Sequence, residues 1–309
     1  MKKIKMQNLN DLRVNEAFEK FVISKKAQGV KDVTIKDYHY HFRSMSKYLD
    51  VEKHFSEMTQ DDLDNMVVGL REAGLASNTV SSYLRVFVTF LHWCNERGYT
   101  ALSMKNLKQE ETVKVTYTDD ELERLLKRPK ANCTFATFRT WVIINFLMDT
   151  GCRAATVCNI LNCDVSLDSS QIIFRHTKNG KVQVIPVSSR MGIILREYMT
   201  IRGGEPRDFL FCNEYGAKMT GDNLHLSIKR YNTSRGVEKT SVHLFRHTFA
   251  RKYLLDCGGN AFTLQKLLGH STLKMTKHYC AIYDADIAKD YDSVSPLANM
   301  QRAKDRIKK

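Results

Sequence analysis

The first hundred residues carry hydrophobic side chains at the spacing of amphipathic helices. In the first segment Val14, Phe18 and Phe21 lie three or four positions apart, so they share one face of a helix that stops at Gly29. Four helices with short connections predict a compact bundle. The predicted helices cover residues 14–29, 33–50, 58–74 and 77–98.

A stretch without periodicity follows this bundle. Residues 101–116 lose the helical pattern and predict a linker. Beyond them Thr118 and Glu121 have the spacing of a capping box, which predicts the start of another helix. We therefore expect a helical N-terminal domain with linker over residues 1–110 and a second domain over residues 111–309.

The second domain mixes helical and strand patterns. A long apolar helix is predicted to end at Gly151, and a further helix after it to give way to a turn. Two β-rich runs flank Asn179-Gly180, the dipeptide preferred in a type I′ hairpin turn, and helices resume from about residue 189. The fold class is therefore predicted to be mainly α, with a small β-sheet in the C-terminal domain.

Length and composition indicate a globular protein. With 309 residues, 43% of them hydrophobic, the chain is long enough for two domains that each bury a core. No apolar stretch is long enough to span a bilayer, and the N-terminal lysines lack the apolar stretch of a signal peptide. We therefore expect a soluble, cytoplasmic protein with no membrane partner.

The eight cysteines form no Cys-x-x-Cys pair and match no zinc-binding pattern. In a cytosolic protein they are most simply small buried thiols. We therefore expect no disulfide, no metal site and no cofactor.

The charge balance favours a polyanionic partner. Lys and Arg total 48 against 34 Asp and Glu, so the formal net charge is +14. Such an excess favours nucleic acid through counterion release. A solvated helix face is the alternative interpretation of the polar helix positions. The candidate DNA-binding residues are Lys31, Thr34, Asn78, Thr79, Ser82, Arg85 and Lys181.

Two basic residues stand where chemistry on phosphate could occur. Arg153 follows a glycine at a helix junction, where a guanidinium can present a planar fork to an anion. Lys178 immediately precedes the hairpin turn, where an ammonium can enter a DNA groove or protonate a departing oxygen. Each also has an ordinary interpretation, because Arg153 can pair with Asp149 and a lysine at a hairpin tip is commonly solvated.

The segment SVHLFRHTFARKYLL, residues 241–255, is more specific. His243 and Arg246 are three apart, so on a helix they share one face and can grip a single oxyanion. His247 lies on the same polar face as His243. A core histidine bonded to a backbone carbonyl is the alternative for either imidazole.

A tyrosine and a histidine near the C-terminus complete a chemical set. His270 and Tyr279 both lie in LLGHSTLKMTKHYC, residues 267–280. Fixed cations can neutralise the charge on a phosphodiester under attack, and a phenolate can form a covalent phosphotyrosine. That link keeps the energy of the broken bond, so religation needs no ATP. Accordingly, no G-x-x-x-x-G-K-[ST] motif occurs.

The chain resembles the tyrosine recombinases, the phage-integrase family, in a series of short motifs. The motifs are TGCR (Arg153), TKNGK (Lys178), HLFRH (His243, Arg246), LGH (His270) and the tyrosine Tyr279. Each motif alone is weak, but six positions in the right order and context are specific. The resemblance covers essentially the whole chain. It implies a two-domain DNA clamp, in which a helical core-binding (SAM-like) domain precedes the tyrosine recombinase catalytic domain.

The resemblance also implies a role for each matched residue. The two arginines would clamp the scissile phosphate, and His270 would donate a hydrogen bond to a non-bridging oxygen. His243 would help to deprotonate Tyr279, whose attack gives a 3′-phosphotyrosyl link. Lys178 would act as general acid toward the 5′-oxygen. The 5′-hydroxyl of a partner duplex then resolves the link, without a metal ion or ATP.

One position departs from the family pattern. The family often has an acidic residue three positions after the first arginine, and this chain has Thr156 there. A neutral hydroxyl can still form a hydrogen bond, so we expect the support of the site to be weaker or supplied elsewhere. We expect activity to be kept, because the residues that would touch phosphate are intact.

The family works as a tetramer whose protomers exchange a C-terminal segment. Here Ile287 and Tyr291, four apart, and Leu297 offer an apolar face after Tyr279. A frayed tail is the alternative interpretation. The resemblance thus implies a homo-tetramer on double-stranded DNA recombination sites, and it allows accessory DNA-binding proteins as further partners.

Three functions fit these observations. The first is a site-specific recombinase that integrates or excises a mobile element or phage. The second is Xer-type resolution of chromosome dimers, and the third is a DNA-binding regulator that does not cut. An intact Tyr279 and both arginines argue against the third. The absence of an arm-binding domain before residue 13 argues against a large arm-bearing integrase.

Overall fold

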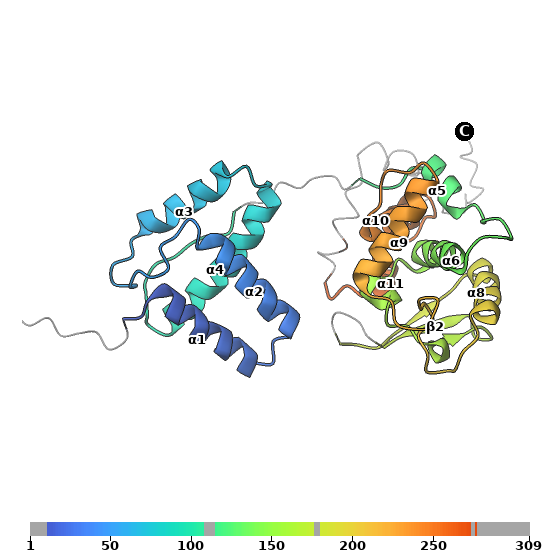
Figure 1. Cartoon of the computed structure of the whole chain (residues 1–309), viewed down its shortest axis with the longest axis horizontal. Helices are drawn as coiled ribbons and strands as arrows, with labels where there is room; N and C mark the ends of the chain where they lie inside the picture. Colours follow the sequence, from blue (N-terminus) through green and yellow to red (C-terminus); the bar gives the residue numbers. More distant parts are fainter. Residues whose placement is uncertain (1–10, 108–114, 176–179, 273–275, 277–309) are drawn as a thin grey trace, which may run out of the picture. The chain divides into compact units, whose positions relative to one another are not determined.

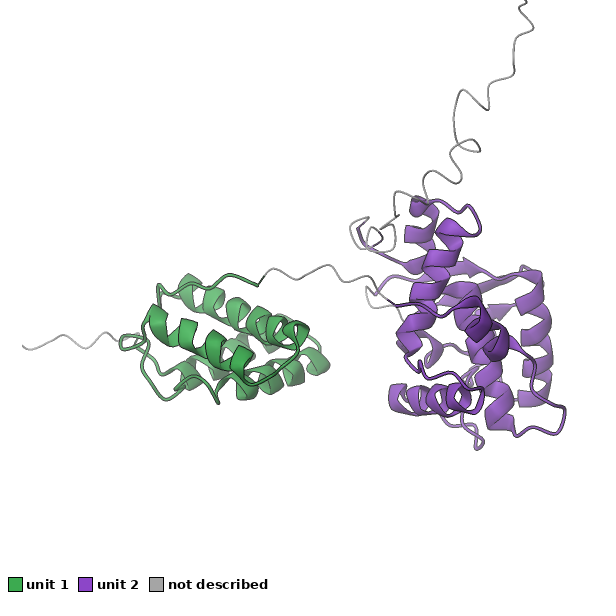
Figure 2. Ribbon diagram, turned by 90° about the horizontal axis from the view of Figure 1, so that it is seen from above, with its two compact units in different colours: residues 1–112 green, residues 113–309 purple. Residues whose placement is uncertain are grey.

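The chain divides into two compact units, residues 1–112 and 113–309 (Figure 2). The computed structural model describes residues 11–107, 115–175, 180–272 and 276. In these ranges the elements are helices apart from one three-stranded sheet in the second unit, so the predicted fold class is confirmed. No helix in the same ranges is long and apolar enough to cross a membrane.

The described part of the first unit is a bundle of four helices (Figure 1). The helices are α1 (Val14–Ala27), α2 (Asp32–Met45), α3 (Gln60–Glu72) and α4 (Ser77–Glu96). Aromatic rings fill the core between α1, α2 and α4. Phe18 stacks on Phe42 with 3.7 Å between ring centroids, and Phe90 meets Phe18 edge-on at 5.5 Å. Phe18 and Phe21 are both buried, as their helical spacing predicts.

The second unit is built around a helix that is buried on all sides. Every residue of α6 (Phe135–Thr150) from Phe138 to Leu147 is buried. A helix that is buried on all its faces belongs to a core rather than a surface. Figure 1 shows further helices arranged around it, and those named next each contact it. They are α5 (Asp119–Leu126), α8 (Ser189–Arg202), α9 (Gly221–Ser234) and α10 (Val242–Leu255), and α11 (Ala261–Leu268) packs on α10.

The sheet is antiparallel, with strand order β1-β2-β3. Its strands are β1 (Val165–Ser166), β2 (Gln171–Phe174) and β3 (Gln183–Pro186). Ile172 pairs with Ile185, and both side chains are buried. The two β-rich runs of the sequence therefore form the predicted hairpin. At its turn Gly180 has a positive φ of 69°, and Asn179 lies outside the described residues.

The segment before the hairpin differs from the predicted helix and turn. Helix α7 covers only Ala154–Val157, and a 3-10 helix, η1 (Asn162–Asp164), and strand β1 follow it. The backbone N–H of Asn162 donates to the carbonyl of Asp208 at 2.9 Å. In a longer helix this N–H would donate to a carbonyl of the same helix. Here it donates to the loop after α8 instead, so the helix does not continue.

The cysteines are distributed between core and surface. The prediction of buried thiols holds for Cys94, Cys152, Cys158 and Cys212. It is wrong for Cys163 and Cys257, which are exposed, while Cys133 is half-buried and Cys280 lies outside the described residues. Within the described ranges, no group of three His, Cys, Asp or Glu side chains is placed to hold a metal ion.

Candidate active site

Arg246 on α10 is the centre of a buried cluster. Its residue surface is 5% exposed. Nη1 donates to the carbonyl of Gly151, and Nη2 donates to the carbonyl of Leu268, both at 2.9 Å. These carbonyls belong to the C-terminal ends of α6 and α11, where helices leave carbonyls without intrahelical partners. The guanidinium thus joins three helices and is held in one orientation.

Gly269 joins the end of α11 to the β-hairpin. It has a left-handed φ of 62°, and a Cβ there would lie 2.7 Å from Oε1 of Gln183. The Gln183 amide donates to the carbonyls of Lys266 and Leu267, the second at 3.0 Å. The base of the hairpin therefore packs against the turn that precedes His270. The sequence has no signal for Gln183, because it is an ordinary strand position.

His270 lies directly beside the central guanidinium. Its Nε2 is 2.8 Å from Nη2 of Arg246, and its Nδ1 is 2.9 Å from Oγ1 of the fully buried Thr276. Burial, and then the charges of Arg246 and Arg153, lower the pKa of His270 to about 4. The imidazole is therefore neutral at pH 7. Sequence analysis did not single out Thr276, although it precedes Tyr279 by three positions.

Arg153 enters the site from the start of α7. It follows Gly151, whose φ of 60° ends α6 and where a Cβ would lie 2.3 Å from a ring carbon of Phe249. Arg153 is half-buried, and together with the exposed His243 it lines a pocket of about 680 Å³. Because its charge contributes to the lowered pKa of His270, it also lies near the buried cluster.

A lysine that sequence analysis did not select lines the same pocket. Lys218 donates from Nζ to Oδ1 of Asn159 at 2.5 Å and lies 5.1 Å from the centre of the Phe209 ring. It adds a positive charge to the pocket that holds Arg153. No spacing in the sequence connects these two residues, so only the folded chain identifies Lys218.

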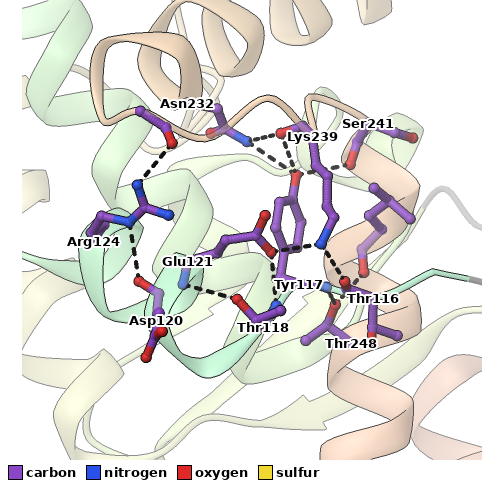
Figure 3. A network of polar contacts seen from close by, with 12 residues as sticks. Thr116, Tyr117, Thr118, Asp120, Glu121, Arg124, Asn232, Lys239, Ser241 and Thr248 are labelled. Carbon is purple, nitrogen blue, oxygen red and sulfur yellow. Dashed lines mark hydrogen bonds and ion pairs between the residues drawn. The ribbon is translucent and has the colours of Figure 1, made fainter.

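A polar network on another side of α10 fixes that helix (Figure 3). The backbone N–H of Tyr117 donates to Oγ1 of Thr248 at 3.0 Å, and the Tyr117 ring stacks on Phe245 at 4.4 Å. Asn232 donates from Nδ2 to the Tyr117 hydroxyl at 3.0 Å. Burial raises the pKa of Tyr117, so the hydroxyl stays protonated and donates to the carbonyl of Lys239 at 3.2 Å. These contacts limit rotation and sliding of α10.

Asp149, a possible partner of Arg153, and Thr156, which stands where the family often has an acidic residue, both lie in the described part of the chain. Asp149 accepts from the backbone N–H of Ser188 at 3.0 Å, and no ion pair of the described residues joins it to Arg153. Thr156 is 8% exposed, and its backbone N–H donates to the carbonyl of Arg153 at 2.9 Å. Thr156 therefore lies in the short helix that Arg153 begins.

Four of the six predicted catalytic residues belong to the described chain. The structure brings three of them to the buried cluster or its edge and places the fourth in the adjoining pocket. The four are Arg153, His243, Arg246 and His270. Lys178, Tyr279 and residues 277–309 lie outside the described residues.

The candidate DNA contacts of the first unit lie on α2 and α4. Lys31, Asn78 and Arg85 are exposed, and Thr34, Thr79 and Ser82 are half-buried. The Ser82 hydroxyl donates to the carbonyl of Asn78 at 2.8 Å. Burial lowers the pKa of His41 on α2, and the positive charge of Arg85 on α4 lowers it further. Because a charge acts on a side chain that is near it, Arg85 lies close to α2, which packs on α4. On the hairpin of the second unit, Lys181 is exposed.

The chain is similar to known recombinases and integrases over most of its length. Tyrosine recombinase XerA of Saccharolobus solfataricus is 26% identical over 288 residues, which cover 89% of this chain and 91% of that protein. The Tn1549 transposon integrase in complex with transposon right end DNA is 20% identical, with a TM-score of 0.75 over 92% of this chain and 99% of that one. A lambda integrase tetramer bound to a Holliday junction is 15% identical, with a TM-score of 0.72 over 89% of this chain and 80% of that one.

The structural likenesses show that the fold is shared. The model of the phage integrase family matches residues 116–286, which is more than half of the chain and includes every predicted catalytic position. The chain therefore belongs to the phage integrase family, the tyrosine recombinases.

Proposed function

We propose that the protein integrates or excises a mobile element or phage genome at specific DNA sites. As a tyrosine recombinase it is a DNA strand transferase that cuts and rejoins DNA through a phosphotyrosyl intermediate. That intermediate keeps the energy of the broken phosphodiester, so rejoining needs no ATP. The proposed catalytic residues are Arg153, Lys178, His243, Arg246 and His270, with Tyr279 as the nucleophile.

The clustering of two guanidiniums around one imidazole supports the strand-transfer chemistry in this proposal. Arg246 lies 2.8 Å from His270, and the charge of Arg153 acts on the same imidazole. Phosphoryl transfer places negative charge on the non-bridging oxygens, which guanidiniums bind through paired N–H groups. Because buried contacts already hold Arg246, little reorganisation is needed when the phosphate arrives.

Chain connectivity supports Tyr279 as the nucleophile. Thr276 is held against His270 at 2.9 Å, and Tyr279 follows three positions later. Three residues span at most about 11 Å between their Cα atoms. The anchor at Thr276 therefore limits how far the phenol can lie from the proposed phosphate clamp.

A nicked suicide duplex tests the strand-transfer chemistry. Cleavage near the nick releases a short fragment, so the covalent protein–DNA adduct cannot be reversed and is seen in denaturing electrophoresis. We expect an adduct with the unaltered protein, with and without a chelator, and none with Tyr279→Phe, which should still bind the duplex. An adduct formed by Tyr279→Phe would disprove the nucleophile assignment. DNA binding without an adduct from the unaltered protein would support a regulator that does not cut.

We further propose DNA contacts from both units and a homo-tetramer as the active assembly. The lambda integrase structure of the same fold is a tetramer on a Holliday junction, and the Tn1549 integrase structure contains DNA. The segment after Tyr279 is proposed as the part that protomers exchange, and accessory DNA-binding proteins as further partners. The proposed DNA contacts are Lys31, Thr34, Asn78, Thr79, Ser82, Arg85 and Lys181.

Xer-type resolution of chromosome dimers is the second candidate, because relatives that match along most of this chain are Xer recombinases. Sequencing the DNA attached to adducts trapped in cells separates the two. Adducts at both ends of a mobile segment support the first proposal. Adducts at a single chromosomal site in cells without such a segment support the second.

A further inference from the structure

A chain of side-chain hydrogen bonds runs from α10 to the segment that carries the proposed nucleophile. Nη2 of Arg246 lies 2.8 Å from Nε2 of His270, and Nδ1 of His270 lies 2.9 Å from Oγ1 of Thr276. The three residues are 5%, 9% and 0% exposed, respectively. These contacts therefore persist in an interior from which water is largely excluded.

The hydrogen-bond chain determines which imidazole nitrogen carries the proton. A guanidinium has N–H donors and no acceptor, so Nε2 of His270 must accept from Arg246. A neutral imidazole has one N–H, which must then be on Nδ1. Nδ1 consequently donates to Oγ1 of Thr276. In this state Nε2 offers a lone pair, whereas binding an oxygen of the phosphate requires an N–H.

Protonation is an unfavourable way to supply that N–H. Two charged groups of the described residues act on the ring from neighbouring elements, Arg246 on α10 and Arg153 at the start of α7, and both are cationic. From α11, the uncharged Gln265 donates to the backbone carbonyl of His270 at 3.2 Å. Both charges and burial oppose an imidazolium, so the pKa of His270 falls to about 4. The remaining way is a change of tautomer.

We propose that Thr276 is a positioning residue whose hydroxyl allows His270 to exchange its two neutral tautomers. Without DNA the hydroxyl accepts from Nδ1–H. With phosphate bound, it turns and donates to Nδ1, so that Nε2–H faces a non-bridging oxygen. During exchange with solvent, before the bound DNA closes the site, a water molecule takes the proton from Nδ1 and another water molecule gives a proton to Nε2, so the charge of the ring and the number of protons are unchanged. This proposal rests on the proposed function of the site.

Threonine suits this role because a hydroxyl can donate or accept after a simple rotation. A carboxylate accepts only, which would fix Nδ1–H, and a lysine donates only, which would fix the other tautomer. In the tautomer with Nε2–H, Nε2 no longer accepts a hydrogen bond from Nη2 of Arg246. The N–H of Nη2 that pointed at His270 can then donate to the phosphate. Imidazole and guanidinium would then bind the phosphate together.

Nitrogen spectroscopy of the imidazoles tests the tautomers directly. We would label the protein with ¹⁵N-histidine and assign the signals of His270 by their loss in His270→Gln. Without DNA we expect a protonated Nδ1 and a bare Nε2. With an intact duplex bound to Tyr279→Phe, which forms no covalent link, we expect the reverse. A bare Nδ1 without DNA, or a protonated Nδ1 in both states, would disprove the proposal.

Variants of Thr276 test its effect on cleavage of the suicide duplex. Thr276→Val keeps the shape but lacks the hydroxyl, so we expect adduct formation to slow by about tenfold, the factor typical of one lost buried hydrogen bond. Thr276→Ser retains the hydroxyl and should stay within about threefold. The matched control is Thr140→Val, which also removes a buried threonine hydroxyl, one that donates to the Ala136 carbonyl at 2.7 Å on α6.

The outcomes separate this inference from the proposed function. Equal rates for Thr276→Val and the unaltered protein, or a Thr276→Ser variant as slow as Thr276→Val, would refute the role of the hydroxyl and leave strand transfer intact. An adduct from Tyr279→Phe would refute the function itself. DNA affinity, measured for every variant, shows whether Thr276→Val still folds, and the spectra of the unaltered protein decide the tautomers independently.

Discussion

Contacts within the protein orient Arg246, one of the two guanidiniums of the proposed phosphate clamp. Arg246 has five N–H groups, and three of them donate to Gly151, Leu268 and His270. These acceptors lie in three directions around a planar group, which an ammonium on a flexible stem cannot reproduce. The chemistry of the site therefore depends on the shape of the guanidinium as well as its charge.

Replacing Arg246 with lysine should abolish most of the activity. We expect Arg246→Lys to slow adduct formation on the suicide duplex by roughly 10²–10³-fold, the range for losing one fixed donor to a developing anion. The matched control is Arg139→Lys on α6, where Arg139 is 6% exposed and donates to the carbonyl of Cys212 at 2.7 Å. Both changes should destabilise the fold, but only the first should slow cleavage by the folded protein. Equal losses would indicate a purely structural role.

Lys178 is expected to protonate the departing 5′-oxygen. Lys178→Ala should therefore cleave a normal suicide duplex slowly, by a factor of about 10²–10⁴ for a lost general acid. A 5′-bridging phosphorothioate has a leaving group that needs no proton, so it should restore the rate. The matched control is Lys181→Ala, close by on the hairpin, which should slow both substrates equally if it acts at all. Absence of rescue in Lys178→Ala would rule out the general acid.

His270 should make the stability of the second unit depend on pH. Its folded pKa of about 4 lies below the ordinary value of 6.5, so the unfolded chain binds a proton first as the pH falls. This contribution is therefore complete above about pH 6.5 and is lost as the pH falls toward 4. In His270→Gln, the free energy of unfolding should fall less over that range.

The two tryptophans allow this measurement on one unit alone. Trp93 lies in the first unit and Trp141 in the second, so a Trp93→Phe background reports only the second unit. Urea unfolding followed by Trp141 fluorescence between pH 4 and 7 then gives the pH dependence with and without His270. Identical curves would show that the imidazole is not held neutral in the folded protein.

Two helix ends of the same kind bring the elements of the site together. Helices α6 and α11 both end in a left-handed glycine, Gly151 and Gly269. Such an end turns the chain sharply and leaves the last carbonyls exposed to a partner. Arg246 donates hydrogen bonds to carbonyls at both of these helix ends. The residues after the two turns are the ones that enter the site.

Adding one methyl group at the end of α6 should disturb the site. Gly151→Ala combines a φ of 60° with a Cβ that would lie 2.3 Å from a ring carbon of Phe249. The matched control is Gly258→Ala, which has a φ of 64° and nothing within 4 Å of the added Cβ. We expect the control to lose about 1–2 kcal/mol from strain, and Gly151→Ala to lose more, because the overlap forces α10 to shift. Equal losses by urea unfolding would show that the contact relaxes freely.

At the scale of the whole molecule, the positive charge that favours a DNA partner is divided unequally between the two units. Residues 1–112 carry 17 Lys and Arg against 15 Asp and Glu, whereas residues 113–309 carry 31 against 19, so almost all of the formal net charge of +14 belongs to the second unit. In the second unit, residues directly after the linker are fastened to α10 through Tyr117 and Thr248 (Figure 3). The linker is thus anchored to the helix that carries two of the proposed catalytic residues.

The first unit should contribute phosphate contacts that salt weakens. Arg85→Ala should lower the affinity for DNA, because one phosphate contact is lost. The slope of log K against the logarithm of the salt concentration should then become less steep by about 0.9, the contribution of one contact. The matched control is Lys20→Ala, which removes an equal charge from the exposed face of α1. Titrations at several salt concentrations measure both slopes. An equal change in the two variants would mean that Arg85 acts only through net charge.

Local signals in the sequence predicted most elements and the identity of the candidate residues. Thr118 does cap α5 by accepting from the backbone N–H of Glu121, and α6 does end at Gly151, because caps and left-handed ends are properties of a few adjacent residues. The segment around α7 was mispredicted, because its backbone bonds to the distant loop at Asp208.

The sequence by itself determined which groups could act on phosphate, because residue types and their order are read directly. It also determined most of the helices, because their periodicity and caps are local. Only the tertiary structure decided that Arg246, His270 and Thr276 form one hydrogen-bond chain, and that Lys218 and Gln183 join the site. The partners in these contacts come from elements that are adjacent only after folding. Packing around α6 and Arg246 sets their distances, and no local pattern encodes them.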